Sequence, residues 1–134
     1  MDTVEAIMTR DVVSVLPETP LLEVQKLLKQ HGFRHLVVVK DGVLKGVLSN
    51  RDVLQALSPF LNTNAETQRD VRTLAYPTRK LMNKNPKTIT PDTPPEKAAH
   101  LLLTEAISAL PVVEGKKLVG IITTKDLLRH YTAT

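Results

Sequence analysis

Nineteen residues near the middle of the chain, LVVVKDGVLKGVLSNRDVL at positions 36–54, recur near its end as LPVVEGKKLVGIITTKDLL at positions 110–128. In each copy an apolar run leads to a turn and then to a second apolar run, which is typical of two strands joined as a hairpin. We place the turns at Asp41-Gly42 and Glu114-Gly115. A polar segment with an aspartate follows each hairpin and changes to helical periodicity. Each copy of the stretch therefore predicts a hairpin followed by a short helix.

The similarity extends well beyond this stretch. A shift of 74 residues aligns positions 4–57 with 78–131 without a gap, and thirteen aligned positions are identical. Ordinary residue frequencies would give roughly three or four identities. We therefore predict one module over residues 1–134, made of a first repeat (4–57), a connector (58–77) and a second repeat (78–131).

A longer helix is expected before each hairpin. Thr19-Pro20 and Thr93-Pro94 have the pattern of a hydroxyl N-cap followed by proline, and Glu96 would complete a capping box in the second repeat. Gly32 is placed to end the first of these helices. Each repeat alone would bury too little surface to be stable. The expected fold class is α+β, with two pseudo-symmetric β-α-β-β-α repeats packed sheet to sheet, and part of the connector, 65–75, is expected to be helical.

Composition excludes several classes of protein. The chain has 42% hydrophobic and 24% charged residues, as in an ordinary globular protein, and no cysteine, which excludes disulfides and thiolate metal sites. Aromatic residues are only 3%, too few for a platform that stacks single-stranded nucleic acid. We find no apolar run long enough for a membrane span and no secretory signal in MDTVEAIMTRD, so we expect a cytoplasmic protein without membrane association.

Positive charge is concentrated in one segment. Residues 69–87 contain six cationic side chains against Asp70, a local net charge of +5 within a chain whose net charge is +4. The cations are Arg69, Arg72, Arg79, Lys80, Lys84 and Lys87. Such a segment is either a solvated linker or a surface that attracts phosphates or an acidic partner.

The motif Gly-x-x-Ser/Thr-x-x-Asp occurs once in each repeat, at Gly46–Asp52 and Gly120–Asp126, where a strand is expected to give way to a helix. One interpretation is purely structural, because Ser49 or Thr123 with an acid three residues later resembles a capping box. The other interpretation is a ligand with a diol and a phosphate. A helix N-terminus offers N–H groups to a phosphate, and a carboxylate can accept two hydroxyl hydrogen bonds. Arg34, His35, Arg51 and Lys125 are the candidate cations for that phosphate.

The duplicated motif, together with Leu110-Pro111-Val112-Val113, resembles a tandem CBS-domain pair, the Bateman module named after cystathionine β-synthase. The resemblance covers about residues 1–133. It implies two pseudo-symmetric clefts between the sheets that bind adenosyl ligands: AMP, ADP or ATP, ahead of S-adenosylmethionine. It implies that Asp52 and Asp126 hold the ribose diol, that Ser49 and Thr123 lie at the phosphate or ribose, and that two strand segments line the adenine. Those segments are Ser14-Val15 and Thr88-Ile89, and Arg34-His35 falls where some members place a basic pair on the phosphates.

The two repeats are not identical at the implied site. Ser108-Ala109 stands where the first repeat has Arg34-His35, and Pro111 stands where the first repeat has Val37. We therefore expect chemically unequal clefts, with Ala109 and Pro111 lining one, and a preference for the phosphate-rich ligand near Arg34 and His35.

These observations favour a regulatory sensor over an enzyme. The two acids are related by duplication, whereas acid–base catalysis needs two carboxylates in different environments at one bond. We find no nucleophile, phosphate-loop or metal-ligand motif, so we predict no catalytic residue, no metal and no catalytic cofactor. The resemblance implies a homodimer through helix faces, and the module would act on a partner protein or through this dimer. Candidates for the dimer face are Leu54, Leu57, Leu128 and Tyr131, which could alternatively belong to the intramolecular core. The alternative is a ligand-free module that uses the basic segment to bind protein or, less in keeping with the composition, nucleic acid.

Overall fold

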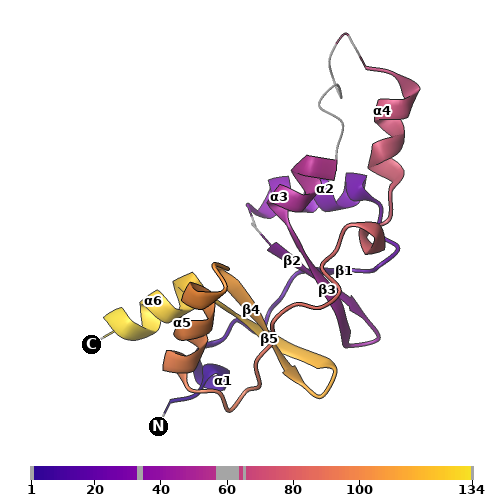
Figure 1. The fold of residues 1–134 in the computed structure, drawn as a ribbon. Coiled ribbons are helices and arrows are strands. Elements are labelled where there is room, and N and C mark those ends of the chain that lie inside the picture. Colours follow the sequence, from indigo (N-terminus) through magenta and orange to yellow (C-terminus); the bar gives the residue numbers. More distant parts are fainter. Residues whose placement is uncertain (1, 33–34, 57–63, 65, 134) are drawn as a thin grey trace. The chain divides into compact units, whose positions relative to one another are not determined.

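The computed structural model describes residues 2–32, 35–56, 64 and 66–133. The chain forms two compact units. Unit 1 comprises Met1–Val12, Gly42–Leu44 and Asn85–Thr134, and unit 2 comprises Val13–Asp41 and Lys45–Lys84. Both contain helices and strands, so the α+β class predicted from the sequence is confirmed (Figure 1).

Unit 2 is built around strands β1, β2 and β3, in that spatial order. Ser14 and Val15 of β1 run parallel to β2, opposite Val37 and Val38. The core combines apolar side chains of these strands with those of α2 and α3, including Leu21, Leu36 and Leu48. The elements are β1 (Ser14–Val15), α2 (Leu21–His31), β2 (His35–Lys40), β3 (Val43–Ser49, whose first two residues count with unit 1), α3 (Asn50–Ala56), α4 (Gln68–Arg72), η1 (Thr73–Ala75) and η2 (Thr78–Lys80).

Unit 1 is built around the antiparallel hairpin of β4 and β5, in which Ala109 lies opposite Thr123. The hairpin turns at Gly115 and Lys116, so the predicted turn at Glu114-Gly115 is wrong by one residue. Gly115 has φ of 63°, a left-handed conformation that glycine adopts without strain. Ile89 forms a parallel bridge with Val112 and takes the role that β1 has in unit 2. The elements are α1 (Val4–Ile7), α5 (Pro95–Thr104), β4 (Ala109–Glu114), β5 (Lys117–Thr123) and α6 (Thr124–Thr132).

The compact units do not coincide with the sequential repeats, because each takes its first segment from the other repeat. Val4 N donates to Thr93 O (2.9 Å) in unit 1, and Thr78 N donates to Thr19 O (2.9 Å) in unit 2. These two hydrogen bonds are related by the same shift of 74 residues. Val4 and Met8 belong to the core of unit 1, and Leu81 and Met82 pack against the core of unit 2.

A glycine in each repeat makes this arrangement possible. A Cβ added at Gly46 would lie 2.6 Å from the backbone oxygen of Asn83, and one added at Gly120 would lie 2.6 Å from Met8 Sδ and 2.9 Å from Thr9 O. Only a residue without a side chain allows the incoming segment to approach the strand so closely.

The predicted caps of the longer helices are wrong. Helix α2 begins at Leu21 with Pro20 at the N-cap, α5 begins at Pro95 with Pro94 at the N-cap, and neither N-cap makes a side-chain hydrogen bond. The threonine hydroxyls are used in the preceding turns instead: Thr19 Oγ1 accepts from Leu16 N (3.0 Å), and Thr93 Oγ1 accepts from Thr90 N (3.3 Å). Gly32 ends α2 in the left-handed conformation, as predicted.

We predict that Gly46→Ala lowers the free energy of unfolding by about 1–3 kcal/mol, because the new methyl group meets a backbone oxygen that cannot rotate away. Gly120→Ala should cost less, since its Cβ would lie 2.9 Å from a backbone oxygen instead of 2.6 Å, and Met8 Sδ, the nearest atom, lies on a flexible side chain. Urea unfolding followed by circular dichroism measures both variants, with Lys45→Ala as the exposed control on the same strand. Equal stabilities of Gly46→Ala and Lys45→Ala would refute the close approach.

Candidate functional site

The motif of the first repeat forms a reciprocal cap at the start of α3. Ser49 N donates to Asp52 Oδ2 (3.1 Å), and Asp52 N donates to Ser49 Oγ (3.0 Å). The Asp52 side chain is half-buried. Among the residues that the structure describes, none donates a hydrogen bond to Asp52 Oδ1. The cap therefore uses one oxygen of this carboxylate and leaves the other with acceptor capacity.

The second repeat has the same cap at the start of α6. Thr123 N donates to Asp126 Oδ2 (3.0 Å), and Asp126 N donates to Thr123 Oγ1 (3.2 Å). The Thr123 hydroxyl also lies 3.0 Å from Asp126 Oδ2 as a donor. The structural interpretation of the motif is thus confirmed in both repeats. The cap hydrogen bonds use Oδ2 of each aspartate and not Oδ1.

Asp126 differs from Asp52 in its further contacts. Thr9 Oγ1 lies 3.1 Å from Asp126 Oδ1 and 3.2 Å from Oδ2, and Arg129 Nη1 lies 3.6 Å from Oδ1. The Asp126 side chain is only 3% exposed. Thr9 could not be identified as a site residue from the sequence, because Thr9 and Asp126 are 117 positions apart and no local pattern connects them.

The structure describes three of the four predicted cations, and two of these three are exposed. Arg51 lies in the first turn of α3 and Lys125 in the first turn of α6, each next to the motif aspartate in sequence. His35 is the first residue of β2 and is half-buried. Arg34, the other half of the predicted basic pair, lies outside the described residues.

The predicted adenine-lining segments lie on strands or bridges beside the hairpins. Val15 and Ile89 are buried, each 6% exposed, and their side chains belong to the cores of their units. Their neighbours Ser14 and Thr88 are exposed. Pro111 is buried in β4, and its carbonyl accepts from Ile89 N at 3.1 Å.

One pair of predicted residues is brought together by strand register. Ala109, the first residue of β4, lies directly opposite Thr123 at the end of β5. The small half-buried side chain of Ala109 thus neighbours the cap of Asp126 within unit 1. Strand pairing at this point could not be assigned from sequence alone, because it depends on the β-bulge between Val112 and Val113.

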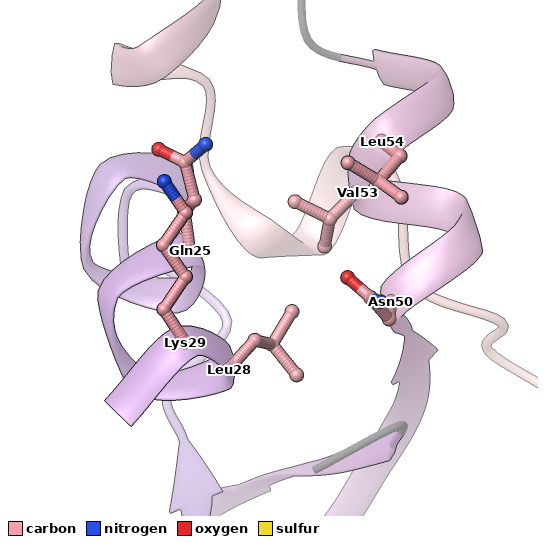
Figure 2. Close-up of a pocket in the computed structure, with 6 residues that line it drawn as sticks. All are labelled: Gln25, Leu28, Lys29, Asn50, Val53 and Leu54. Atoms are coloured by element: carbon pink, nitrogen blue, oxygen red, sulfur yellow. The ribbon is translucent and has the colours of Figure 1, made fainter. Parts of the chain in front are cut away.

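A shallow groove lies elsewhere in unit 2, on its helical side. Figure 2 shows Leu28 of α2 and Val53 of α3 projecting toward each other across it, with Lys29 on the α2 side and Asn50 on the α3 side. Its volume of about 110 Å³ is well below that of ordinary small-molecule pockets, which is roughly 300–1,000 Å³. Asp52 does not line the groove, so the groove is not a candidate site for the adenosyl ligand expected from the sequence.

The basic segment is divided between the two units. Arg79 and Lys80 are exposed in unit 2, where Lys80 Nζ lies 5.7 Å from the centre of the Tyr76 ring. Lys87 belongs to unit 1 and pairs there with Glu105 at 3.5 Å. The segment therefore does not form one continuous structural element. In the part of the chain that the structure describes, no helix is long and apolar enough to span a membrane.

Comparison with known proteins identifies the family. The model of the CBS domain matches residues 4–59 and again residues 79–133. The chain is 35% identical over 127 residues to the CBS domain-containing protein YhcV of Bacillus subtilis, covering 95% of this chain and 84% of that protein. Some relatives are much longer: the chain spans only 23% of inosine-5'-monophosphate dehydrogenase from Korarchaeum cryptofilum (31% identical over 124 residues, 92% of this chain).

Solved structures agree with this assignment. CBSX2 in complex with AMP is 31% identical, with a TM-score of 0.82 over 98% of this chain and 96% of that chain. The CBS domain pair of protein MJ0100, in complex with 5'-methylthioadenosine and S-adenosyl-L-methionine, is 25% identical, with a TM-score of 0.77 over 97% and 99%. The resemblance noted in the sequence is confirmed: the chain belongs to the CBS domain family and consists of a pair of CBS domains.

Proposed function

We propose that this CBS pair is a regulatory module that binds an adenosyl ligand, with Asp52 and Asp126 as the carboxylates that hold its ribose. The observation that carries the proposal is the geometry at Asp52. One oxygen of its carboxylate caps α3 through Ser49 N, while the other receives no hydrogen bond among the described residues. The cap fixes the carboxylate in place, and the second oxygen is an acceptor open to a further donor.

A ribose diol matches this acceptor. Its two adjacent hydroxyl groups are donors, and a carboxylate is an acceptor with two oxygens. Hydrogen bonds to a charged group contribute about 1.5–3 kcal/mol each, roughly twice a neutral one. A carboxylate held by its own helix loses little freedom on binding, so more of this free energy becomes affinity.

The cations beside the carboxylates suit the phosphate. Arg51 and Lys125 are exposed and directly precede the motif aspartates, with no ion pair to another described residue. We infer that they, with Arg34, His35 and the hydroxyls of Ser49 and Thr123, favour AMP, ADP or ATP over S-adenosylmethionine, which has no phosphate. Ser14, Val15, Thr88 and Ile89 would line the adenine with Ala109 and Pro111, largely through backbone groups, since Val15 and Ile89 point into the cores.

Two relatives support this class of ligand. CBSX2 was solved in complex with AMP, and the MJ0100 pair was solved with 5'-methylthioadenosine and S-adenosyl-L-methionine. All three molecules contain an adenosyl group with a ribose diol, and the groups attached at its 5' position are a phosphate, a thioether and a sulfonium. The ribose is thus the part that the proposed carboxylates would recognise in each.

The proposed output of binding is regulation, either of a partner protein or through a dimer of this chain. We assign no chemical step to the module. Each motif carboxylate has a structural role in the cap of its own helix. The inosine-5'-monophosphate dehydrogenase relative is matched over only 23% of its length, so its activity is not transferred to this chain.

The test is isothermal titration calorimetry with AMP, ADP, ATP and S-adenosylmethionine. We predict that Asp52→Asn weakens AMP binding about ten-fold or more, because the amide keeps one oxygen for the cap but loses the charge that strengthens the ribose hydrogen bonds. Asp41→Asn is the matched control, since Asp41 is an exposed acid of the same unit in a hairpin turn. Melting temperatures of both variants show whether the cap survives.

Three outcomes are informative here. Unchanged AMP affinity in Asp52→Asn and in the double variant with Asp126→Asn would reject the ribose role. Binding of no adenosyl compound would reject the proposed function. If polynucleotide then bound with a steep salt dependence, the alternative module that uses the basic segment would replace it.

We also propose that the chain forms a homodimer through its helix faces. Leu54 of α3 is 63% exposed, and Leu128 and Tyr131 of α6 are 59% and 52% exposed. Leu103 of α5 is 82% exposed, while Leu57 lies outside the described residues. Exposed apolar side chains on a helix face are typical of interfaces, and a two-fold dimer buries the same face of both copies.

We predict that Leu128→Asp shifts the protein from dimer to monomer in light scattering after size exclusion, because a buried charge without a partner opposes association. Glu114→Asp, an exposed change at the end of β4, should leave the mass unaltered. A wild-type protein that is monomeric at micromolar concentration would contradict the dimer.

A further inference from the structure

The carboxylate of Asp126 is occupied by a residue from the start of the chain. The Thr9 hydroxyl lies 3.1 Å and 3.2 Å from its two oxygens, so a single donor proton is shared between them. Thr123 supplies backbone and hydroxyl donors to Oδ2, and Arg129 lies 3.6 Å from Oδ1. The side chain of Asp126 is almost completely buried by these contacts.

Thr9 is held at this position by its backbone. Thr9 N donates to Ile121 O, and Ile121 N donates to Thr9 O, both at 2.9 Å, which forms an antiparallel bridge to β5. Gly120 leaves the space that this approach needs, because a Cβ there would lie 2.9 Å from Thr9 O. The bridge to β5 therefore holds the backbone of Thr9 in place, so that its hydroxyl lies beside Asp126.

The first repeat has the same bridge but a different residue in it. Asn83 takes the place of Thr9 and pairs with Val47 through hydrogen bonds of 3.1 Å and 2.8 Å. At Asp52, the only donor to the carboxylate among the described residues is Ser49 N. The two motifs thus share a cap and a bridge, and they differ in the donor that the bridge brings to the carboxylate.

We propose that Thr9 is a specificity-determining residue that closes Asp126 to a diol, so that an adenosyl ligand is taken first by the Asp52 motif. This inference rests on the proposed ribose role of the two carboxylates. A diol brings two donors, and at Asp126 it must displace the Thr9 hydroxyl to find an acceptor with free capacity. At Asp52 the described residues supply no such side-chain donor that a diol would have to displace. One chain therefore binds adenosyl ligand in two affinity ranges.

The test isolates the second motif in an Asp52→Asn background and titrates it with AMP by calorimetry. Thr9→Val removes the hydroxyl and keeps the shape and extended backbone of the residue. We expect it to tighten AMP binding at Asp126 about ten-fold, the amount that one hydrogen bond to a charged group represents. Thr9→Ser is the matched control, because it keeps the hydroxyl and should retain the weaker affinity.

The outcomes separate this inference from the proposed function. Absence of adenosyl binding in the wild-type chain would overturn both. If the wild-type chain binds an adenosyl ligand, two results would overturn the inference alone. One is that Thr9→Val leaves the AMP affinity of the Asp52→Asn variant unchanged, and the other is that the wild-type chain binds AMP at two sites of equal affinity. Thr9→Ala is the second variant if Thr9→Val fails to fold, and the same ten-fold gain is expected of it.

Discussion

The structure depends on a reciprocal hydrogen-bonded cap at the point where the last strand of each repeat becomes a helix. A helix start leaves several backbone N–H groups without intrahelical partners, and a hydroxyl with an acid three residues later satisfies two of the N–H groups at this end. Here the cap fixes Ser49 to Asp52 and Thr123 to Asp126. Because the cap engages mainly one oxygen of each acid, the same side chain can stabilise the helix and present an acceptor to a ligand. The structural and functional interpretations of the motif are therefore compatible.

The N-terminal segment of each repeat packs with the other repeat, and this exchange determines which donor lies beside the motif carboxylate. Residues that precede β1 pack in unit 1, and residues at the start of the second repeat pack in unit 2, each bridged to a strand beside a glycine. The residue that follows the methionine of each segment, Thr9 or Asn83, lies in that bridge. Threonine at position 9 donates to Asp126, whereas position 83 is asparagine. A single difference within a duplicated framework gives the two motifs unequal chemistry.

The duplication made most of the fold predictable from the sequence, because a repeated hydrophobic pattern and glycine turns act locally. The helix ended by Gly32, both hairpins and the α+β class follow from such signals. The caps proposed at Thr19 and Thr93 were wrong, since those hydroxyls are used by the preceding turns, which local helix rules do not consider. The pairing of residues 4 to 9 with the later part of unit 1 was not predictable from the sequence. It joins segments more than 80 residues apart, and only tertiary packing determines it. Thr9 was missed as a site residue for the same reason.

The most direct test of the central claim is a crystal structure of the chain with AMP. The account predicts that the ribose hydroxyl oxygens lie about 2.7–3.0 Å from the Asp52 carboxylate while Ser49 N remains bonded to its Oδ2. A structure in which AMP binds with its ribose away from both motif acids, or in which the cap opens to release Asp52, would contradict it.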